Sequence, residues 1–356
     1  MRKRSATSIW TRALKRHMVV VTRSALRAGR TVQKLGAVRQ APRDPKRPIR
    51  PNTENWRAGV AASPAGVRRY QLFTPSSGVP TRGFPLMVML HGCGQDGCGM
   101  AASTRMNQLA TTANFMVLYP EQDRLANAHA CWNWFDTRAG RAQREVASIL
   151  STIEQVCASH AVDANHIVIA GMSAGASMAV LTALHQPERF LAVAMHSGVG
   201  PGMAHSTGTA LAAMRGRIPK GVTGLAAMKS MLPPLLVIQG MGDSTVSPSN
   251  GITTAQRWAK ALDATESEHR VVQRGKRYAA TWRDWKLGKR VVATLVEVAG
   301  LGHAWSGGAG AQAFSDPHGP DASRMVWAFS QRVRIQRAAM LESQGYLHPV
   351  NTCRVL

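Results

Sequence analysis

The sequence predicts an α/β protein with a mostly parallel central sheet covered by helices on both faces. Short apolar segments rich in β-branched residues alternate with amphipathic segments along most of the chain, as in repeated strand–helix units. One predicted strand, at 166–170, runs through a Gly-x-Ser-x-Gly sequence directly into an Ala-rich helix at 176–185. Hydrophobic residues make up 45% of the 356 residues, which is ample for a core. In such sheets ligands bind beyond the carboxyl ends of the strands, so we expect the functional residues in the loops that follow those ends.

The individual elements follow from apolar patterning and turn residues. Apolar runs bounded by turns predict an edge strand at 67–73, a central strand within 85–92, and further strands at 115–119, 166–170, 190–195, 235–239 and 291–298, the last of the sheet. Helical spacing predicts helices at 103–114, 141–159, 176–185, near 253–262 and at 321–334. The helix at 141–159 is the clearest, because its apolar residues share one face. A Gly- and Met-rich excursion occupies 198–231.

Positive charge is concentrated at the N-terminus. The formal net charge is +25, and residues 1–50 contain 15 Lys and Arg against one acid, Asp44. Within this arm, residues 8–28 carry an apolar stripe at helical spacing, which predicts a basic amphipathic helix suited to an anionic or amphiphilic surface such as a lipid headgroup layer. The alternative is a solvated or cleaved tail, because positive charge alone says only that polyanions are attracted.

These patterns divide the chain into three parts. A basic arm with a Pro-rich linker occupies 1–55, the main domain 56–335, and a weakly patterned tail 336–356. No apolar run approaches the ~20 residues needed to span a bilayer, so we predict no transmembrane segment. We also predict no specific nucleic-acid binding, because the sequence contains no recognised groove-reading module.

The Gly171-Met172-Ser173-Ala174-Gly175 segment predicts a catalytic serine. Glycines at both ends let the backbone turn sharply from strand to helix, which exposes the serine hydroxyl above the sheet. The pattern alone has a chance expectation of roughly 0.2 matches in a chain of this composition, so the flanking elements decide the interpretation. A strand before it and an Ala-rich helix after it are the context that the motif requires, and we assign Ser173 as a nucleophile.

Asp243 and His303 are the predicted partners of Ser173. A serine needs a histidine to take its proton, and the histidine needs a carboxylate to fix its tautomer. Asp243 follows the strand at 235–239 and His303 follows the strand at 291–298, which gives the chain order Ser, acid, His. The alternatives are a turn aspartate and a surface loop histidine. His196 is a weaker candidate base because it precedes the acid.

Two backbone N–H groups are predicted to form an oxyanion hole. One belongs to Ala174, directly after the nucleophile, and the other to Cys93 in the loop His91-Gly92-Cys93-Gly94-Gln95 after the first central strand. The alternative for this loop is a plain glycine turn.

Five motifs together resemble the polyhydroxybutyrate (PHB) depolymerase-type esterases, a family that includes feruloyl and acetylxylan esterases. They are Leu90-His-Gly-Cys-Gly-Gln95, Cys131-Trp-Asn-Trp-Phe135, Gly171-Met-Ser-Ala-Gly175, Gly302-His-Ala-Trp-Ser-Gly-Gly308 and Gly319-Pro-Asp-Ala-Ser323. The resemblance covers residues 66–330 and implies an α/β-hydrolase fold and ester hydrolysis through an acyl-enzyme. It implies no metal and no cofactor, and it gives the same triad of Ser173, Asp243 and His303.

The resemblance also bears on the cysteines and on the compartment. It implies a Cys93–Cys131 disulfide, which the placement of both residues in loops after neighbouring strands also suggests; the alternative is two free thiols in a reducing cytosol. Secretion is usual in the family, yet we find no ordinary signal peptide, so a cytoplasmic location is the alternative.

Trp132, Trp134 and Trp305 are candidate substrate contacts, since flat aromatic faces suit an ester chain or a phenolic acyl group. Burial in the core is the alternative for each. The predicted function is a serine esterase acting on short-chain hydroxyalkanoate polyesters or oligomers. The alternatives are a feruloyl or acetylxylan esterase, and a granule- or polyanion-binding protein that uses the basic arm.

Overall fold

A computed structural model describes residues 55–217, 225 and 232–343. Three predicted parts of the chain lie wholly or mostly outside these residues: the arm helix at 8–28, nearly all of the 1–55 segment and the end of the predicted tail. In the ranges described, no helix is long and apolar enough to cross a membrane.

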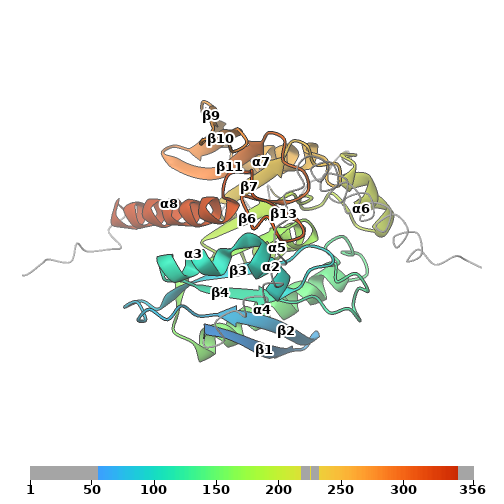
Figure 1. Cartoon of the computed structure of the whole chain (residues 1–356), viewed down its shortest axis with the longest axis vertical. Coiled ribbons are helices and arrows are strands. Elements are labelled where there is room, and N and C mark those ends of the chain that lie inside the picture. Colours follow the sequence, from blue (N-terminus) through green and yellow to red (C-terminus); the bar gives the residue numbers. More distant parts are fainter. Residues whose placement is uncertain (1–54, 218–224, 226–231, 344–356) are drawn as a thin grey trace, which may run out of the picture. The chain divides into compact units, whose positions relative to one another are not determined.

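The described residues contain a sheet of 11 strands (Figure 1). The strands are β1 (Trp56–Ser63), β2 (Gly66–Phe73), β3 (Phe84–Leu90), β4 (Met116–Pro120), β5 (Val162–Met172), β6 (Ala192–His196), β7 (Leu235–Gly240), β8 (Thr265–Glu266), β9 (Arg270–Val272), β10 (Ala280–Leu287) and β11 (Arg290–Val298). Their order is β1-β2-β4-β3-β5-β6-β7-β11-β10-β8, with β9 also paired to β10. The six strands from β4 to β11 pair in parallel, and the outer strands at both ends are antiparallel. All carboxyl ends of the parallel strands therefore meet at one edge.

Helices cover both faces of this sheet. They are α2 (Gly97–Thr104), α3 (Met106–Ala113), α4 (Arg141–Ser159), α5 (Ala174–His185), α6 (Thr207–Met214), α7 (Ser249–Ala261) and α8 (Ala322–Ser343). Helix α3 packs with α8, whereas α4 packs with α5 and α7 contacts β7 and β11. The mainly parallel sheet with helices on both faces confirms the predicted α/β-hydrolase fold.

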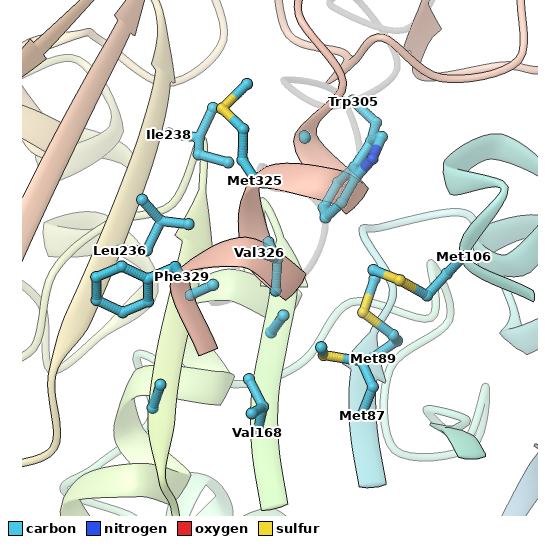
Figure 2. Close-up of a cluster of buried hydrophobic side chains, with 14 of the residues drawn as sticks. Met87, Met89, Met106, Val168, Leu236, Ile238, Trp305, Met325, Val326 and Phe329 are labelled. Carbon is cyan, nitrogen blue, oxygen red and sulfur yellow. The ribbon is translucent and has the colours of Figure 1, made fainter. Parts of the chain in front are cut away.

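The core beneath α8 shows the alternation expected of a buried strand. Figure 2 places Met87 and Met89 of β3 and Leu236 of β7 in one apolar cluster with Phe329 of α8. Burying a side chain such as Phe329 contributes about 1.5–3 kcal/mol. The alternate residue Val88 is also buried but lies outside the cluster, so it faces the opposite helix layer.

The sequence did not predict the edges of the sheet correctly. The segment 67–73 is not an edge strand, because β1 pairs along its full length. Strand β10 was not predicted either, although it lies between β8 and β11. In both β1 and β10 the large apolar residues are interrupted by charged and small ones, so neither strand shows a regular alternation of large apolar residues.

Two helices also differ from their predicted bounds. The helix predicted at 103–114 covers the last two residues of α2 and all of α3, which are separated at Arg105, whose φ of 56° is left-handed. Helix α8 continues to Ser343, past the domain boundary predicted at 335. By contrast, α4 has the bounds that its periodicity predicted.

Candidate active site

Ser173 occupies a strained turn between β5 and α5. Its φ of 56° and ψ of −123° are unusual for a residue with a side chain. The turn closes so tightly that a Cβ on Gly171 would lie 2.4 Å from the backbone of Gly175. Glycine is therefore required there, and the geometry is that of a nucleophile elbow, in which strain exposes the serine hydroxyl.

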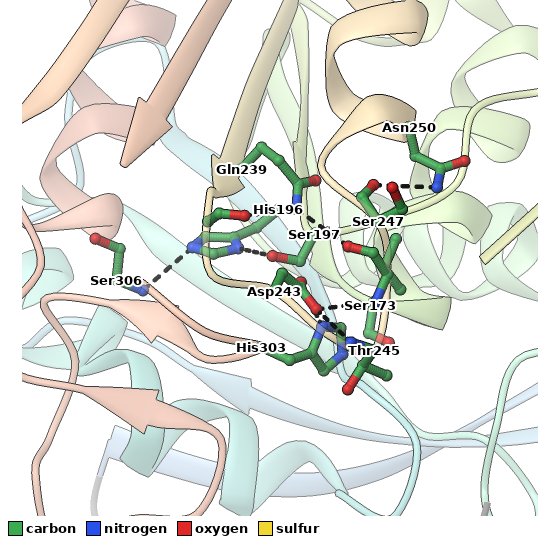
Figure 3. A network of polar contacts seen from close by, with 12 residues as sticks. Ser173, His196, Ser197, Gln239, Asp243, Thr245, Ser247, Asn250, His303 and Ser306 are labelled. Atoms are coloured by element: carbon green, nitrogen blue, oxygen red, sulfur yellow. Dashed lines mark hydrogen bonds and ion pairs between the residues drawn. The ribbon is translucent and has the colours of Figure 1, made fainter. Parts of the chain in front are cut away.

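Asp243 and His303 meet at the carboxyl edge of the sheet, as Figure 3 shows. His303 Nδ1 lies 2.8 Å from Asp243 Oδ2, and the Asp243 side chain is fully buried. The other carboxylate oxygen of Asp243, Oδ1, accepts hydrogen bonds from the N–H groups of Thr245 and Val246. Burial alone would raise the pKa of Asp243, but the His303 contact and these two N–H groups together hold it below its usual value. The carboxylate therefore stays ionised and fixes the Nδ1–H tautomer of His303.

Ser173 is drawn in the same cluster as this pair in Figure 3. The described residues show no hydrogen bond between the Ser173 hydroxyl and His303. Catalytic hydrogen bonds are often long without substrate and tighten only when it binds. The His303 Nε2 atom is the acceptor that remains, because Nδ1 already faces Asp243.

The loop after β3 lies directly against the nucleophile turn. A Cβ on Gly175 would come within 2.2 Å of the Leu90 carbonyl oxygen, and one on Gly92 would lie 3.7 Å from the Ser173 Cβ. In the described part of the chain, neither the Cys93 N–H nor the Ala174 N–H donates a hydrogen bond to protein. Both N–H groups therefore have no protein acceptor among the described residues, and Ala174 also begins α5, whose N-terminus favours negative charge. Their role as oxyanion donors stays a prediction.

His91 fixes the conformation of residues 91–95, the loop after β3, which is called the oxyanion loop below after its predicted role. The Gln122 N–H donates to His91 Nε2 at 3.0 Å, so the ring proton is on Nδ1, which lies 2.8 Å from the Gly92 carbonyl oxygen. Complete burial lowers the pKa of His91 to about 4 and keeps the ring neutral. The neutral ring can then donate on one side and accept on the other.

A buried polar network also holds the loop after β3 in place. Trp132 Nε1 donates to the His91 carbonyl oxygen, and Gln122 Nε2 donates to the carbonyl oxygen of Cys131 and to Glu145 Oε1. Arg68 packs over the Trp132 ring and donates to the Gln122 side chain. No sequence pattern points to Arg68, Gln122 or Glu145, because their partners lie far away along the chain.

A disulfide joins Cys93 to Cys131, with the two Cα atoms 4.2 Å apart. It fastens the oxyanion loop to the Cys131-Trp-Asn-Trp segment, which is the pairing that the resemblance implied. Cys98 and Cys157 are free thiols.

The burial of two tryptophans corrects the hypothesis that they contact substrate. Trp132 is 0% exposed and Trp305 is 1% exposed. Each uses its indole N–H internally, Trp132 to the His91 carbonyl oxygen and Trp305 to Ser323 Oγ. They support loops and offer no free aromatic face. Trp134 retains 8% exposure, and for that residue substrate contact stays a prediction.

His196, the weaker candidate for the catalytic base on chain order, also lies in this site. Its carbonyl oxygen accepts the Ser173 N–H, and the charges of His303 and Asp243 act on its ring. Elsewhere, the described ranges contain no group of three or more His, Cys, Asp or Glu side chains placed to hold a metal ion.

Comparisons with known proteins show which family this chain is similar to. The family profile described as "Esterase PHB depolymerase" matches residues 68–270. Poly(3-hydroxyalkanoate) depolymerase C of Paucimonas lemoignei is 30% identical over 191 residues, covering 51% of this chain and 46% of that protein. Feruloyl esterase B of Neurospora crassa is 28% identical over 147 residues, covering 41% and 47%. The chain thus spans about half the length of the curated relatives it matches.

A solved structure supports the fold independently. The acetyl xylan esterase from Aspergillus awamori superposes with a TM-score of 0.57 at 18% identity, covering 70% of this chain and 93% of that one. The family profile extends from β2 to the first residue of β9, so it includes the nucleophile turn, the loop after β3 and Asp243 but ends before His303. On this evidence the chain belongs to the PHB depolymerase family of esterases.

Proposed function

We propose that this protein is a serine-dependent carboxylic ester hydrolase that works through an acyl-enzyme. The observation that carries the proposal is the His303–Asp243 hydrogen bond of 2.8 Å, formed at the same sheet edge as the strained turn of Ser173. Nucleophile, base and orienting acid come from three loops, as nucleophilic catalysis by serine requires.

In the first half-reaction Ser173 Oγ attacks the ester carbonyl carbon while its proton moves to His303 Nε2. The buried carboxylate of Asp243 stabilises the imidazolium that forms. Negative charge on the former carbonyl oxygen is met by the N–H groups of Cys93 and Ala174. The bond to the leaving alcohol then breaks, and His303 donates the proton to that alcohol.

In the second half-reaction water attacks the acyl-enzyme. His303 takes a proton from the water, the bond between the acyl group and Ser173 Oγ breaks, and the proton returns to Ser173. The products are a free carboxylic acid and the resting enzyme, so the protein ends each cycle unchanged.

For the substrate we propose short-chain hydroxyalkanoate polyesters or their oligomers. The depolymerase relative supports this choice, since it has the highest identity of the relatives described above. Feruloyl or acetylated-sugar esters are the second candidate, supported by the feruloyl esterase above and by acetylxylan esterase A of Talaromyces purpureogenus, which is 26% identical over 195 residues.

The experiment is a side-by-side rate comparison with purified full-length protein. Hydroxybutyrate oligomers, amorphous polymer granules, p-nitrophenyl acyl esters, feruloylated sugars and acetylated xylan serve as substrates, and the Ser173→Ala variant is the blank. We expect kcat/KM for the oligomers to exceed that for the sugar esters. The reverse order would reject the hydroxyalkanoate assignment but keep the esterase, whereas no turnover above the blank on any ester would reject the hydrolase itself.

We further propose that residues 8–28 attach the enzyme to an anionic surface such as a granule coat. Their apolar stripe and basic remainder support it, because an interfacial helix gains from buried apolar area and from charge. Co-sedimentation with granules or anionic vesicles compares the full chain, a chain starting at Asn52 and a Trp10→Ser/Leu14→Ser variant of unchanged net charge. We expect binding to fall in both variants while soluble-ester turnover is kept. Equal sedimentation of all three would reject the attachment.

A further inference from the structure

We infer that His196 is a positioning residue that connects the loop carrying His303 to the strand end beside Ser173. The inference rests on the proposed serine hydrolase function and gives His196 a role other than that of the catalytic base, for which its place in the chain order makes it the weaker candidate. His196 ends β6, which lies next to β5 and therefore next to the nucleophile turn.

The hydrogen bonds of the imidazole fix its tautomer. The Ser306 N–H donates to His196 Nε2 at 3.1 Å, so Nε2 carries no proton. The ring proton is then on Nδ1, which lies 3.1 Å from the Ser197 hydroxyl oxygen and donates to it. Both ring nitrogens are used, and His196 is only 1% exposed.

Through these bonds His196 contacts both the backbone of Ser173 and the loop that carries His303. The His196 carbonyl oxygen accepts the Ser173 N–H at 2.9 Å, while its ring anchors Ser306, three positions after His303. Figure 3 shows the ring of His196 between Ser306 and Ser197. A shift of this ring would move the His303 loop relative to the nucleophile.

Packing restricts the ring further. It stacks on Trp305 with centroids 5.0 Å apart, and Trp305 Nε1 donates to Ser323 Oγ at 3.1 Å. Ser323 Oγ in turn donates to the Thr104 carbonyl oxygen at 2.7 Å. The His303 loop is thereby tied through Trp305 to the start of α8 and the end of α2.

Strained backbone at Ser197 is a second observation that supports the role. Ser197 has a φ of 52°, a conformation that glycine would adopt without cost, yet the residue is a fully buried serine. Its N–H donates to the Ile238 carbonyl oxygen at 3.0 Å, and its hydroxyl is the only side-chain group that meets His196 Nδ1 among the described residues. A serine in this position is explained by the hydroxyl that accepts the ring proton.

The charge state of the ring agrees with this geometry. Burial, together with repulsion from His303, lowers the pKa of His196 to about 3, and the attraction of Asp243 opposes this only in part. A neutral ring keeps the Nε2 lone pair for Ser306. It also adds no positive charge beside the His303 imidazolium that forms during the reaction.

The test compares three substitutions at this position. Glutamine can place an amide oxygen near the position of Nε2 and accept the Ser306 N–H, leucine has similar bulk but no acceptor, and asparagine reaches Ser197 but is too short for Ser306. We expect His196→Leu and His196→Asn to lose about 10- to 100-fold in kcat with KM within about threefold, because a misplaced catalytic group has this cost. His196→Gln should recover most of kcat, and the surface control His185→Leu should match the wild type.

A spectroscopic readout separates this inference from the proposed function. The low-field proton NMR resonance of the His303–Asp243 hydrogen bond should persist in wild type, in His196→Gln and in Ser173→Ala, and should shift or broaden in His196→Leu and His196→Asn. This holds even if no tested ester is hydrolysed. Wild-type kcat and an unchanged resonance in both the leucine and asparagine variants would overturn the inference. Equal loss in all three variants, in proportion to their lowered Tm, would also overturn it, because it would show a purely structural role.

Discussion

His303 Nδ1 lies 2.8 Å from Asp243 Oδ2, although 60 residues separate the two in the chain. The sheet explains their meeting, because β7 and β11 are parallel neighbours and both residues follow carboxyl ends. The two loops also pack on each other. The Gly242 N–H donates to the Leu301 carbonyl oxygen at 2.9 Å, and a Cβ on Gly240 would lie 2.3 Å from the same oxygen.

Asp243→Asn should abolish most of the activity while leaving the fold intact. An asparagine side chain can donate to His303 Nδ1, which moves the ring proton to Nε2 and removes the acceptor for Ser173. We expect kcat to fall by about 10³- to 10⁴-fold. Steady-state kinetics and thermal unfolding measure the two effects.

Asp284→Asn is the matched control for that substitution. Asp284 is also a buried carboxylate, but it bonds Thr294 and Arg332. The Asp284→Asn substitution should lower Tm and leave kcat unchanged. Comparable kcat losses in the two variants would contradict a specific role for Asp243.

Gly175→Ala should disrupt the site through sterics alone. The added Cβ would lie 2.2 Å from the Leu90 carbonyl oxygen and 2.4 Å from that of His91, and both are backbone atoms that cannot rotate away. We expect a loss of about 1–3 kcal/mol in the free energy of unfolding, as for other overpacked sites, with a fall in kcat because the oxyanion loop moves. Gly208→Ala in α6 is the control, since a Cβ there has nothing within 4 Å. Unchanged unfolding and kcat in Gly175→Ala would contradict the close approach.

The Cys93–Cys131 bridge should support both stability and rate. A disulfide that closes a loop of 38 residues stabilises by about 2–4 kcal/mol, and this one also holds the Cys93 N–H in place. Mass mapping of the native protein should recover the linked peptides, and Cys131→Ser should lower both Tm and kcat. Cys98→Ser, at an exposed free thiol, should change neither. Recovery of both cysteines as free thiols from fully active protein would contradict the bridge.

Acid should destabilise the fold through its buried neutral histidines. Burial lowers the pKa of His91 and His166 to about 4 and that of His196 to about 3, so between these values and the ordinary pKa of 6.5 the unfolded chain binds more protons. The free energy of unfolding therefore falls as pH drops from about 6.5 towards 4. Each histidine contributes up to about 1.4 kcal/mol per pH unit.

His166→Phe isolates one of these contributions away from the active site. His166 stacks on Trp327 with an interplanar angle of 1°, and its buried Nε2 has no hydrogen-bond partner in the described part of the chain, so a phenyl ring can replace it. Urea unfolding at pH 7 and about pH 4.5 should show a smaller acid loss in this variant than in the wild type. The exposed-site control His185→Phe should keep the wild-type loss, and identical losses in His166→Phe and wild type would contradict the assignment.

The buried centre of the fold could be predicted from sequence because each element carries its own pattern. Helix α4 has an apolar stripe that includes Val146, Ile149 and Ile153, and its predicted and observed bounds are the same. The edges could not be predicted, because their residues are stabilised by partners distant in sequence. Arg283 of β10 pairs with Glu297 and Asp284 with Arg332, so charges that resemble a loop in the sequence lie in a strand.

The candidate site, like the fold, could be predicted from the sequence only in part. Ser173, Asp243 and His303 follow predicted strands, so their common edge could be inferred from strand order. The supporting residues have no such signal: the role of His196 depends on Ser306, 110 residues away. The sequence also left open whether Trp132 is buried or contacts substrate, because its indole N–H bonds a loop 41 residues earlier.

Active-site labelling tests the central claim most directly. Full-length protein is treated with a fluorophosphonate probe, digested and mapped by mass spectrometry, with and without an excess of a hydrolysable ester. We predict a single adduct on Ser173 that the ester competes away, absent from Ser173→Ala and retained in the surface control Ser159→Ala. An adduct on another residue, or undiminished labelling of Ser173→Ala, would contradict the assignment of Ser173 as the nucleophile.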